Sequence, residues 1–124
     1  LSPYLSVGEC NKGFLRDDAL LFVTFITDTE DDKSKTYPTD WYKAIVKAKH
    51  GDPGAVVTLL VRPQLNDEPP PGCTTDDDGK SKLRDLITMF PFHVEGDTCA
   101  SSYAPYFTDA AKMVSEACAS FVPQ

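Results

Sequence analysis

Two apolar runs constrain the fold of this chain more than any other feature of its sequence. Residues 19–27 read ALLFVTFIT and residues 55–61 read AVVTLLV, and both runs are rich in β-branched and aromatic residues. Runs of this kind, without polar alternation, are typical of strands that are buried on both faces of a parallel sheet. We therefore predict a central strand at 19–27 and a second buried strand at 55–61.

Helical patterns lie between and after these runs. Thr39 or Asp40 can cap a first helix, and Gly51, followed by Asp52 and Pro53, ends it. Apolar residues recur at three- and four-residue spacing in this helix and in two later ones. These residues are Trp41, Tyr42, Ile45, Val46 and Ala48, then Leu83, Leu86, Ile87 and Phe90, and finally Phe107, Ala110, Ala111, Val114, Cys118 and Phe121.

Strand and helix therefore alternate along the chain. Pro91 ends the second helix, and we expect a short third strand at 92–94 before the last helix. Right-handed crossovers between such strands give a parallel sheet with helices on its faces. The predicted fold is a single α/β unit over residues 1–124, Rossmann-like with the order βαβαβα. A long acidic, proline-rich loop at 62–79 interrupts it.

Three strands are few for such a fold. A doubly wound sheet normally has about five or six strands, and a sheet of three leaves one edge open. The sequence also begins at Leu1, in the middle of a pattern. We therefore expect this chain to be the second half of a larger α/β domain, whose first half is carried by a companion chain or fragment.

The charge balance and the length of the apolar runs argue against a nucleic-acid partner and against a membrane span. Nineteen acidic and 12 basic side chains give a formal charge of −7. Nothing on such a chain would drive counterion release from a phosphate backbone, so no nucleic-acid partner is expected. No apolar run approaches the ~18–20 residues that span a bilayer, so no membrane span is expected either.

The chain contains four cysteines, Cys10, Cys73, Cys99 and Cys118, and none belongs to the C-x-x-C pair of a zinc site. Two disulfides in an exported protein allow three connectivities. We favour Cys99–Cys118, because a cysteine just before a helix can reach back to the last turns of that helix; Cys10–Cys73 then follows by elimination. Such bonds imply a secreted, periplasmic or cell-surface protein. Four free thiols in a cytosolic protein are the alternative.

An acidic loop directly follows the first apolar run, and it is the segment where we expect functional chemistry. The loop carries Asp28, Glu30, Asp31 and Asp32. In open parallel sheets, ligands bind beyond the carboxyl ends of the strands. Crowded carboxylates repel one another, and Mg²⁺ and Ca²⁺ prefer such oxygen ligands. These four residues are therefore the predicted metal ligands, with an ordinary solvated loop as the alternative.

Several motifs resemble those of one family. Residues 11–20 read NKGFLRDDAL, and FITDTEDD follows at 25–32. The chain closes with CASSYAPYF at 99–107 and CASFVP at 118–123. In this order the motifs resemble the later half of a von Willebrand factor type A domain, and more narrowly the exported type A-like domains of myxobacteria and other proteobacteria. The resemblance covers nearly the whole chain.

The resemblance implies a metal-ion-dependent adhesion site built from three loops. Asp28 matches the Asp of the third loop, with Thr29 where many members have Gly. The D-x-S-x-S of the first loop and the Thr of the second have no counterpart, since the D-x-S-x-T at 32–36 begins four residues beyond the strand end. This chain would then hold one ligand of a Mg²⁺ site, which again implies a companion carrying the first half.

Two functions follow for the whole chain. The first is a non-catalytic adhesion module that binds a protein partner through a divalent cation, which accepts an oxygen from an Asp or Glu of that partner. The second is a structural or assembly subunit with a degenerate metal site. An enzyme is not expected: Asp28-x-Glu30 lacks the second Asp of haloacid-dehalogenase phosphatases, so phosphoryl transfer is a distant third.

Overall fold

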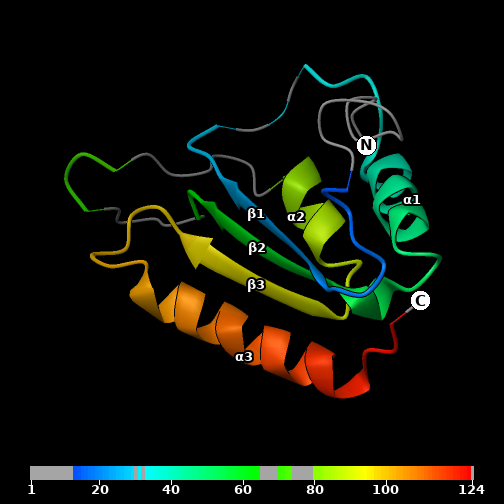
Figure 1. Cartoon of the computed structure of the whole chain (residues 1–124). Helices are drawn as coiled ribbons and strands as arrows, with labels where there is room; N and C mark the ends of the chain where they lie inside the picture. The colour runs from blue at the N-terminus through cyan, green and yellow to red at the C-terminus, as the bar shows by residue number, and fades with distance from the viewer. Residues whose placement is uncertain (1–12, 30, 32, 65–69, 74–79, 124) are drawn as a thin grey trace.

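The computed structural model describes residues 13–29, 31, 33–64, 70–73 and 80–123. Strands and helices alternate in the predicted order (Figure 1). They are β1 (Leu21–Ile26), α1 (Pro38–Ala48), the short 3-10 helix η2 (Pro53–Ala55), β2 (Val56–Arg62), α2 (Lys82–Ile87), β3 (Phe92–Asp97) and α3 (Ala104–Ser120). The predicted α/β fold, a parallel sheet with flanking helices, is confirmed.

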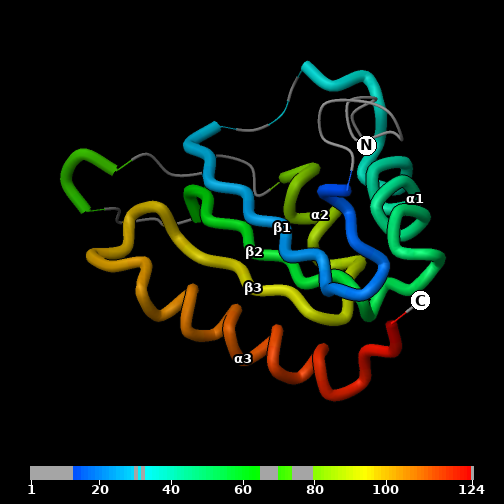
Figure 2. The backbone as a smooth tube through the Cα atoms, in the orientation of Figure 1, coloured from blue at the N-terminus to red at the C-terminus, as the bar shows by residue number. Residues whose placement is uncertain are grey.

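The three strands form one parallel sheet in the order β1-β2-β3. Leu21 lies opposite Val56 on the neighbouring strand, and Val57 lies opposite Phe92. The order of the strands across the sheet is the same as their order along the chain. Right-handed crossovers therefore place α1 and α2 on the same face of the sheet. Helix α3, which leads to no further strand, covers the other face, as the path of the backbone in Figure 2 shows.

The central strand is β2, not β1. All seven residues of β2 are buried, whereas β1 alternates between half-buried and exposed residues. The prediction of a central strand, buried on both faces, at residues 19–27 is therefore wrong. Apolar side chains make burial favourable, but the position of a strand in the sheet decides which faces are covered, and β1 lies at an edge among the strands that the structure describes.

One face of β1 is largely uncovered. Phe22 and Ile26 are 44% and 59% exposed on this face, with Thr24 between them. The side chains of the opposite face pack on the core around Val56 and Phe90, under α1 and α2. Helix α3 packs mainly on β2 and β3, so apolar surface of β1 remains open to solvent beside it.

Helix α3 faces the sheet with small residues. Ala110 and Ala117 are its buried residues. Phe107, Ala111 and Cys118, which the apolar spacing predicted to face inward, are exposed. The predicted apolar face is therefore wrong at these three positions. The predicted inward position of Ala110 is confirmed, because Ala110 is buried in the core around Leu59 and Val61.

Gly96 allows α3 to approach the sheet closely. A Cβ atom at this position would lie 2.5 Å from Cδ2 of Tyr106. The Tyr106 ring packs against the core around Leu59 and Val61, and its centre lies 6.4 Å from that of Tyr103. The ring of Tyr106 therefore lies directly on the backbone of β3, where a side chain on the strand would displace it.

Helix α1 begins slightly before its predicted cap. Tyr37 is the residue before its first turn, and Pro38 is the first helical residue. Asp40, one of the predicted caps with Thr39, lies inside the helix, and its carboxylate accepts a hydrogen bond from the backbone N–H of Tyr37 (3.2 Å). Gly51 has φ +89°, which is the left-handed conformation expected after a helix end.

Helix α2 is shorter and β3 is longer than predicted. The Ser81 hydroxyl caps α2 by accepting a hydrogen bond from a backbone N–H of its first turn (3.1 Å), and the helix ends at Ile87. Phe90 lies beyond the helix and is still buried. The apolar spacing therefore identified a core residue but not the helix end. Strand β3 continues to Asp97.

Cys99 forms a disulfide with Cys73, with Cα atoms 5.7 Å apart. The predicted pairing Cys99–Cys118 is wrong, because Cys118 is a free and exposed thiol near the end of α3. Cys73 and Cys99 follow neighbouring strands at the same edge of the sheet, whereas α3 carries Cys118 ~20 Å away at ~1.5 Å per residue. The pairing Cys10–Cys73 is therefore wrong as well, and Cys10 itself lies outside the described residues.

Candidate functional site

The carboxyl ends of the three strands meet at one edge of the sheet (Figure 1). The ladder continues just past the strands: Thr27 N–H donates to the carbonyl oxygen of Val61 (3.0 Å), and Thr98 N–H donates to that of Arg62 (3.1 Å). Ligands of parallel sheets bind at this edge. We define the carboxyl-edge site by its polar residues, which are Asp28, Asp31, Arg62, Gln64, Arg84 and Glu95.

Asp28 lies exposed just beyond the end of β1. Thr27 stabilises the turn that holds it. The Thr27 hydroxyl donates a hydrogen bond to the carbonyl oxygen of Thr29 (2.7 Å) and accepts one from the N–H of Thr29 (3.1 Å). The turn therefore presents the Asp28 carboxylate to solvent, and such an oxygen suits a hard cation such as Mg²⁺ or Ca²⁺.

Asp31 organises the loop that follows. Its Oδ1 accepts hydrogen bonds from the backbone N–H groups of Ser34 (2.8 Å) and Lys33 (3.2 Å). The hydrogen bond from the Ser34 side chain, followed by these backbone bonds, lowers the pKa of Asp31, because each of them stabilises the ionised carboxylate. Lys82 holds the same loop from α2, since its Nζ donates to the carbonyl oxygen of Ser34 (2.9 Å).

The structure describes two of the four predicted metal ligands, Asp28 and Asp31. Glu30 and Asp32 lie outside the described residues. Within the part of the chain that the structure describes, no three His, Cys, Asp or Glu side chains form a group that could hold a metal ion. The oxygen chemistry of Asp28 fits a divalent cation, but one carboxylate is not a complete site. The metal site therefore stays a prediction.

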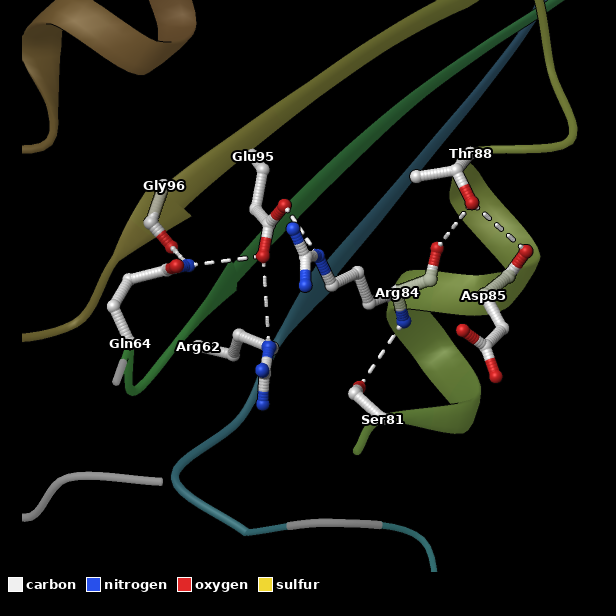
Figure 3. Close-up of polar contacts among 8 residues, drawn as sticks. All are labelled: Arg62, Gln64, Ser81, Arg84, Asp85, Thr88, Glu95 and Gly96. Carbon is white, nitrogen blue, oxygen red and sulfur yellow. Dashed lines mark hydrogen bonds and ion pairs between the residues drawn. The ribbon is translucent and has the colours of Figure 1, made fainter. Parts of the chain in front are cut away.

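A polar cluster at this edge was not anticipated from the sequence (Figure 3). Glu95 of β3 accepts hydrogen bonds from Arg84 Nε on α2 (3.1 Å) and from Gln64 Nε2 (3.1 Å). Arg62 at the end of β2 forms an ion pair with the same carboxylate, with 3.6 Å between Nε and Oε1. The Arg62 side chain is only 3% exposed, whereas that of Arg84 is 51% exposed.

The cluster joins the ends of β2 and β3 to α2. Among the described residues it combines two guanidinium groups with one carboxylate beside the acidic loop. A guanidinium as buried as that of Arg62 needs a close carboxylate, because its desolvation is otherwise costly. One sequence signal could have identified Arg62: it is the charged residue that ends the apolar run at 55–61. No local pattern links Arg84 to Glu95.

The disulfide fastens the long loop after β2 to the turn after β3. Asp97 supports that turn, because its Oδ1 accepts a hydrogen bond from the N–H of Cys99 (2.9 Å). The predicted proline-rich loop at 62–79 is therefore anchored at Cys73, next to the carboxyl edge. Residues 65–69 and 74–79 of this loop lie outside the described part of the chain.

The opposite, amino edge of the sheet contains a buried lysine. Lys49, after the end of α1, is 2% exposed. Its Nζ donates hydrogen bonds to the carbonyl oxygens of Arg16 (2.6 Å) and Ala19 (2.7 Å), and it lies 5.7 Å from the centre of the Phe121 ring. These contacts join the chain before β1, the end of α1 and the chain after α3. Lys49 therefore has a structural role.

Comparisons with known proteins identify no relative of this chain. No family model, no curated protein and no solved structure matches it. The resemblance to type A domains therefore depends on the sequence motifs quoted above. Among the described residues, no helix is both long and apolar enough to cross a membrane.

Proposed function

We propose that this chain is the C-terminal half of a von Willebrand factor type A-like domain, and that it acts as a non-catalytic, metal-dependent protein-binding module in adhesion. A divalent cation, Mg²⁺ or Ca²⁺, binds at Asp28, and a protein partner completes its coordination with an Asp or Glu side chain. One observation carries the proposal. Asp28 is exposed just beyond the carboxyl end of β1, and it matches the Asp of the third metal-binding loop of type A domains.

The strand order supports this proposal. In a doubly wound sheet with the order 3-2-1-4-5-6, the last three strands are parallel neighbours that follow one another in chain order. Strands β1, β2 and β3 have the same relationship. Under the proposal β1 corresponds to the fourth strand, and its outer edge faces the first strand of the missing half.

A companion chain or fragment is therefore part of the proposal. Phe22 and Ile26 expose apolar surface on one face of β1, and β2 is the one strand that pairs with β1 among the described strands. An exposed strand edge is a template for pairing with further chain. An added parallel strand and its helix would pair with this edge, cover Phe22 and Ile26, and supply the remaining metal ligands.

A secreted, periplasmic or cell-surface location agrees with this function. The disulfide Cys73–Cys99 supports it, because such bonds persist in oxidising compartments. The net charge of −7 favours a protein partner over nucleic acid.

A structural or assembly subunit with a degenerate metal site is the second candidate. The hydrogen bonds of Asp31 favour it, because Oδ1 of this carboxylate is engaged by the backbone of its own loop. Fewer carboxylate oxygens then remain for a cation beside Asp28. In this case the open edge of β1 still accepts the companion, and the domain serves only to assemble.

Calorimetric titration separates the two candidates. Mg²⁺, Mn²⁺ and Ca²⁺ are titrated into the full chain together with its companion, and into the Asp28→Ala and Asp109→Ala variants. Asp109 is a matched control, because it is an exposed aspartate on α3. We expect saturable binding that Asp28→Ala removes and Asp109→Ala retains. Equal binding by all three proteins, or binding by none, would contradict the metal-dependent function and leave the assembly role.

A further inference from the structure

A cleft of about 350 Å³ lies between α1, α2 and the end of β1. Its apolar walls are Phe25, Trp41, Ala44, Ile45, Leu83 and Leu86, and its polar lining is Asp31 and Ser34. Small-ligand sites are typically clefts of ~300–1,000 Å³ with apolar walls and a few placed polar groups. The cleft lies on the α1 and α2 side of the sheet, so it is distinct from the uncovered face of β1.

The walls of the cleft are held in place before any ligand binds. The indole N–H of Trp41 donates a hydrogen bond to the Thr36 hydroxyl, which satisfies the one polar atom of this side chain. Lys82 on α2 holds the loop at Ser34. Trp41 and Ser34 are therefore held by hydrogen bonds before a ligand binds, and less ordering of these two residues lowers the entropic cost of binding.

Two features of the lining favour a cationic ligand. Phe25 and Trp41 supply aromatic rings, whose faces attract ammonium and guanidinium groups. Asp31 supplies a carboxylate that is oriented by the N–H groups of Lys33 and Ser34, both bound to Oδ1. A carboxylate accepts about four hydrogen bonds; the Ser34 hydroxyl also donates to Asp31, so about one position remains for a ligand. The net charge of −7 adds to the same preference.

Lys82 is a positive charge close to the cleft. Its charge acts on Asp31, but its hydrogen bond is made to the carbonyl oxygen of Ser34 and not to the carboxylate. Lys82 therefore weakens the attraction of Asp31 for a cation without occupying its oxygens.

We propose that this cleft binds a small organic cation, a ligand with an aromatic or branched aliphatic body and an ammonium or guanidinium group. The body lies against Phe25, Ile45 and Leu86, and the cationic group lies between Trp41 and Asp31. Because Asp31 is also one of the predicted metal ligands, the titrations below contain EDTA. Their outcome is then independent of whether the metal-dependent function is correct.

The single tryptophan of the chain reports on this cleft directly. The full chain is titrated at neutral pH with benzylamine, benzyl alcohol and benzoate, which share a ring and differ in charge. Trp41 fluorescence and the amide shifts of the cleft residues are followed. We expect benzylamine to bind about fivefold more tightly than benzyl alcohol, and benzoate to bind more weakly than both.

Two variants locate the binding. Asp31→Asn keeps an oxygen for the loop and removes the charge, so we expect it to lower benzylamine affinity about threefold and to leave the smaller preference over benzyl alcohol that the aromatic rings supply. The control Asp109→Asn on α3 leaves the preference unchanged. Ala44→Leu fills the cleft, so we expect it to remove binding of both benzylamine and benzyl alcohol. Leu83→Phe fills the cleft from α2 and is tested in its place if Ala44→Leu does not fold.

The proposal is overturned by any of three results. These are the absence of a saturable response to benzylamine, equal affinity for all three probes, and a preference for benzylamine that Asp31→Asn leaves intact.

Discussion

Gly96 is the position where one added methyl group tests how α3 packs on the sheet. A Cβ atom on Gly96 would lie 2.5 Å from Cδ2 of Tyr106 and 2.7 Å from both Cγ and Cε2. Ordinary van der Waals contact begins at 3.4 Å, so the ring must retreat by about 0.9 Å (3.4 minus 2.5), or the strand must shift by as much.

The cost follows from the surroundings of the ring. Tyr106 packs on the core around Leu59, Val61 and Ala110, so it has little room to retreat. Adding carbon to a packed core costs ~1–3 kcal/mol, and the better strand preference of alanine offsets ~0.5–1 kcal/mol of this. Because three ring atoms would lie within 2.7 Å of the added carbon, the packing cost falls in the upper part of this range, ~2–3 kcal/mol, and we expect Gly96→Ala to lower the free energy of unfolding by ~1–2.5 kcal/mol.

Urea unfolding, followed by Trp41 fluorescence, measures this loss. We expect a lower urea concentration at the midpoint and an unchanged dependence of the free energy of unfolding on urea concentration. The Tyr106→Ala variant provides the control, because it removes the ring. In that background we expect Gly96→Ala to stabilise by ~0.5–1 kcal/mol, so the coupling energy in the double-mutant cycle equals the packing cost of ~2–3 kcal/mol.

Either of two results would refute this reasoning. If Gly96→Ala is as stable as the wild type, the helix and sheet have room for a methyl group. If the loss is the same with and without the Tyr106 ring, the cost arises in the backbone of β3 and not in the contact with α3.

Three further predictions concern the loops and the edges of the sheet. Asp31 titrates below the usual aspartate pKa of ~3.9, and Ser34→Ala raises that pKa; carboxyl ¹³C shifts measure both. The pKa of Asp31 is lower in the folded state than in the unfolded state. The stabilisation from Asp31 is therefore complete at pH values above its unfolded-state pKa, and it is lost as the pH falls through its folded-state pKa. Iodoacetamide labels Cys118 in the folded, unreduced protein, and peptide mapping recovers Cys73 linked to Cys99; a Cys99–Cys118 peptide would contradict the structure. Lys49→Met leaves two carbonyl oxygens without their donor, so we expect it to lower the free energy of unfolding by ~2–4 kcal/mol in urea unfolding. A loss under ~0.5 kcal/mol, as for an ordinary surface substitution, would show that the hydrogen bonds of Lys49 do not stabilise the fold.

The elements of the fold were predictable because their signals are local. Apolar runs identified β1 and β2, and three- and four-residue spacing identified all three α-helices. The predicted ends were less accurate. Phe90 matched the spacing of α2 but lies beyond that helix, since side chains of a turn can reach the same core as those of the last helical residues.

The candidate site was predictable only in part. Asp28 was identified because a polar residue directly after an apolar strand lies at the carboxyl edge of a parallel sheet, whichever position the strand takes in that sheet. The contacts of Glu95 with Arg62 and Arg84 were missed. They join three elements that are separated along the chain, and no periodicity within one element indicates them.

The sequence by itself determined the alternation of strands and helices and, through the handedness of crossovers, a parallel α/β sheet. These features follow from hydrophobic periodicity and backbone chirality, which act over short stretches of chain. Only the tertiary structure decided that β2 is the central strand of the described sheet, that Phe107 and Ala111 of α3 lie outside its buried face, and that Cys99 pairs with Cys73. Each of these depends on which segments become neighbours in space, and the same apolar strand or reactive cysteine would suit more than one neighbour.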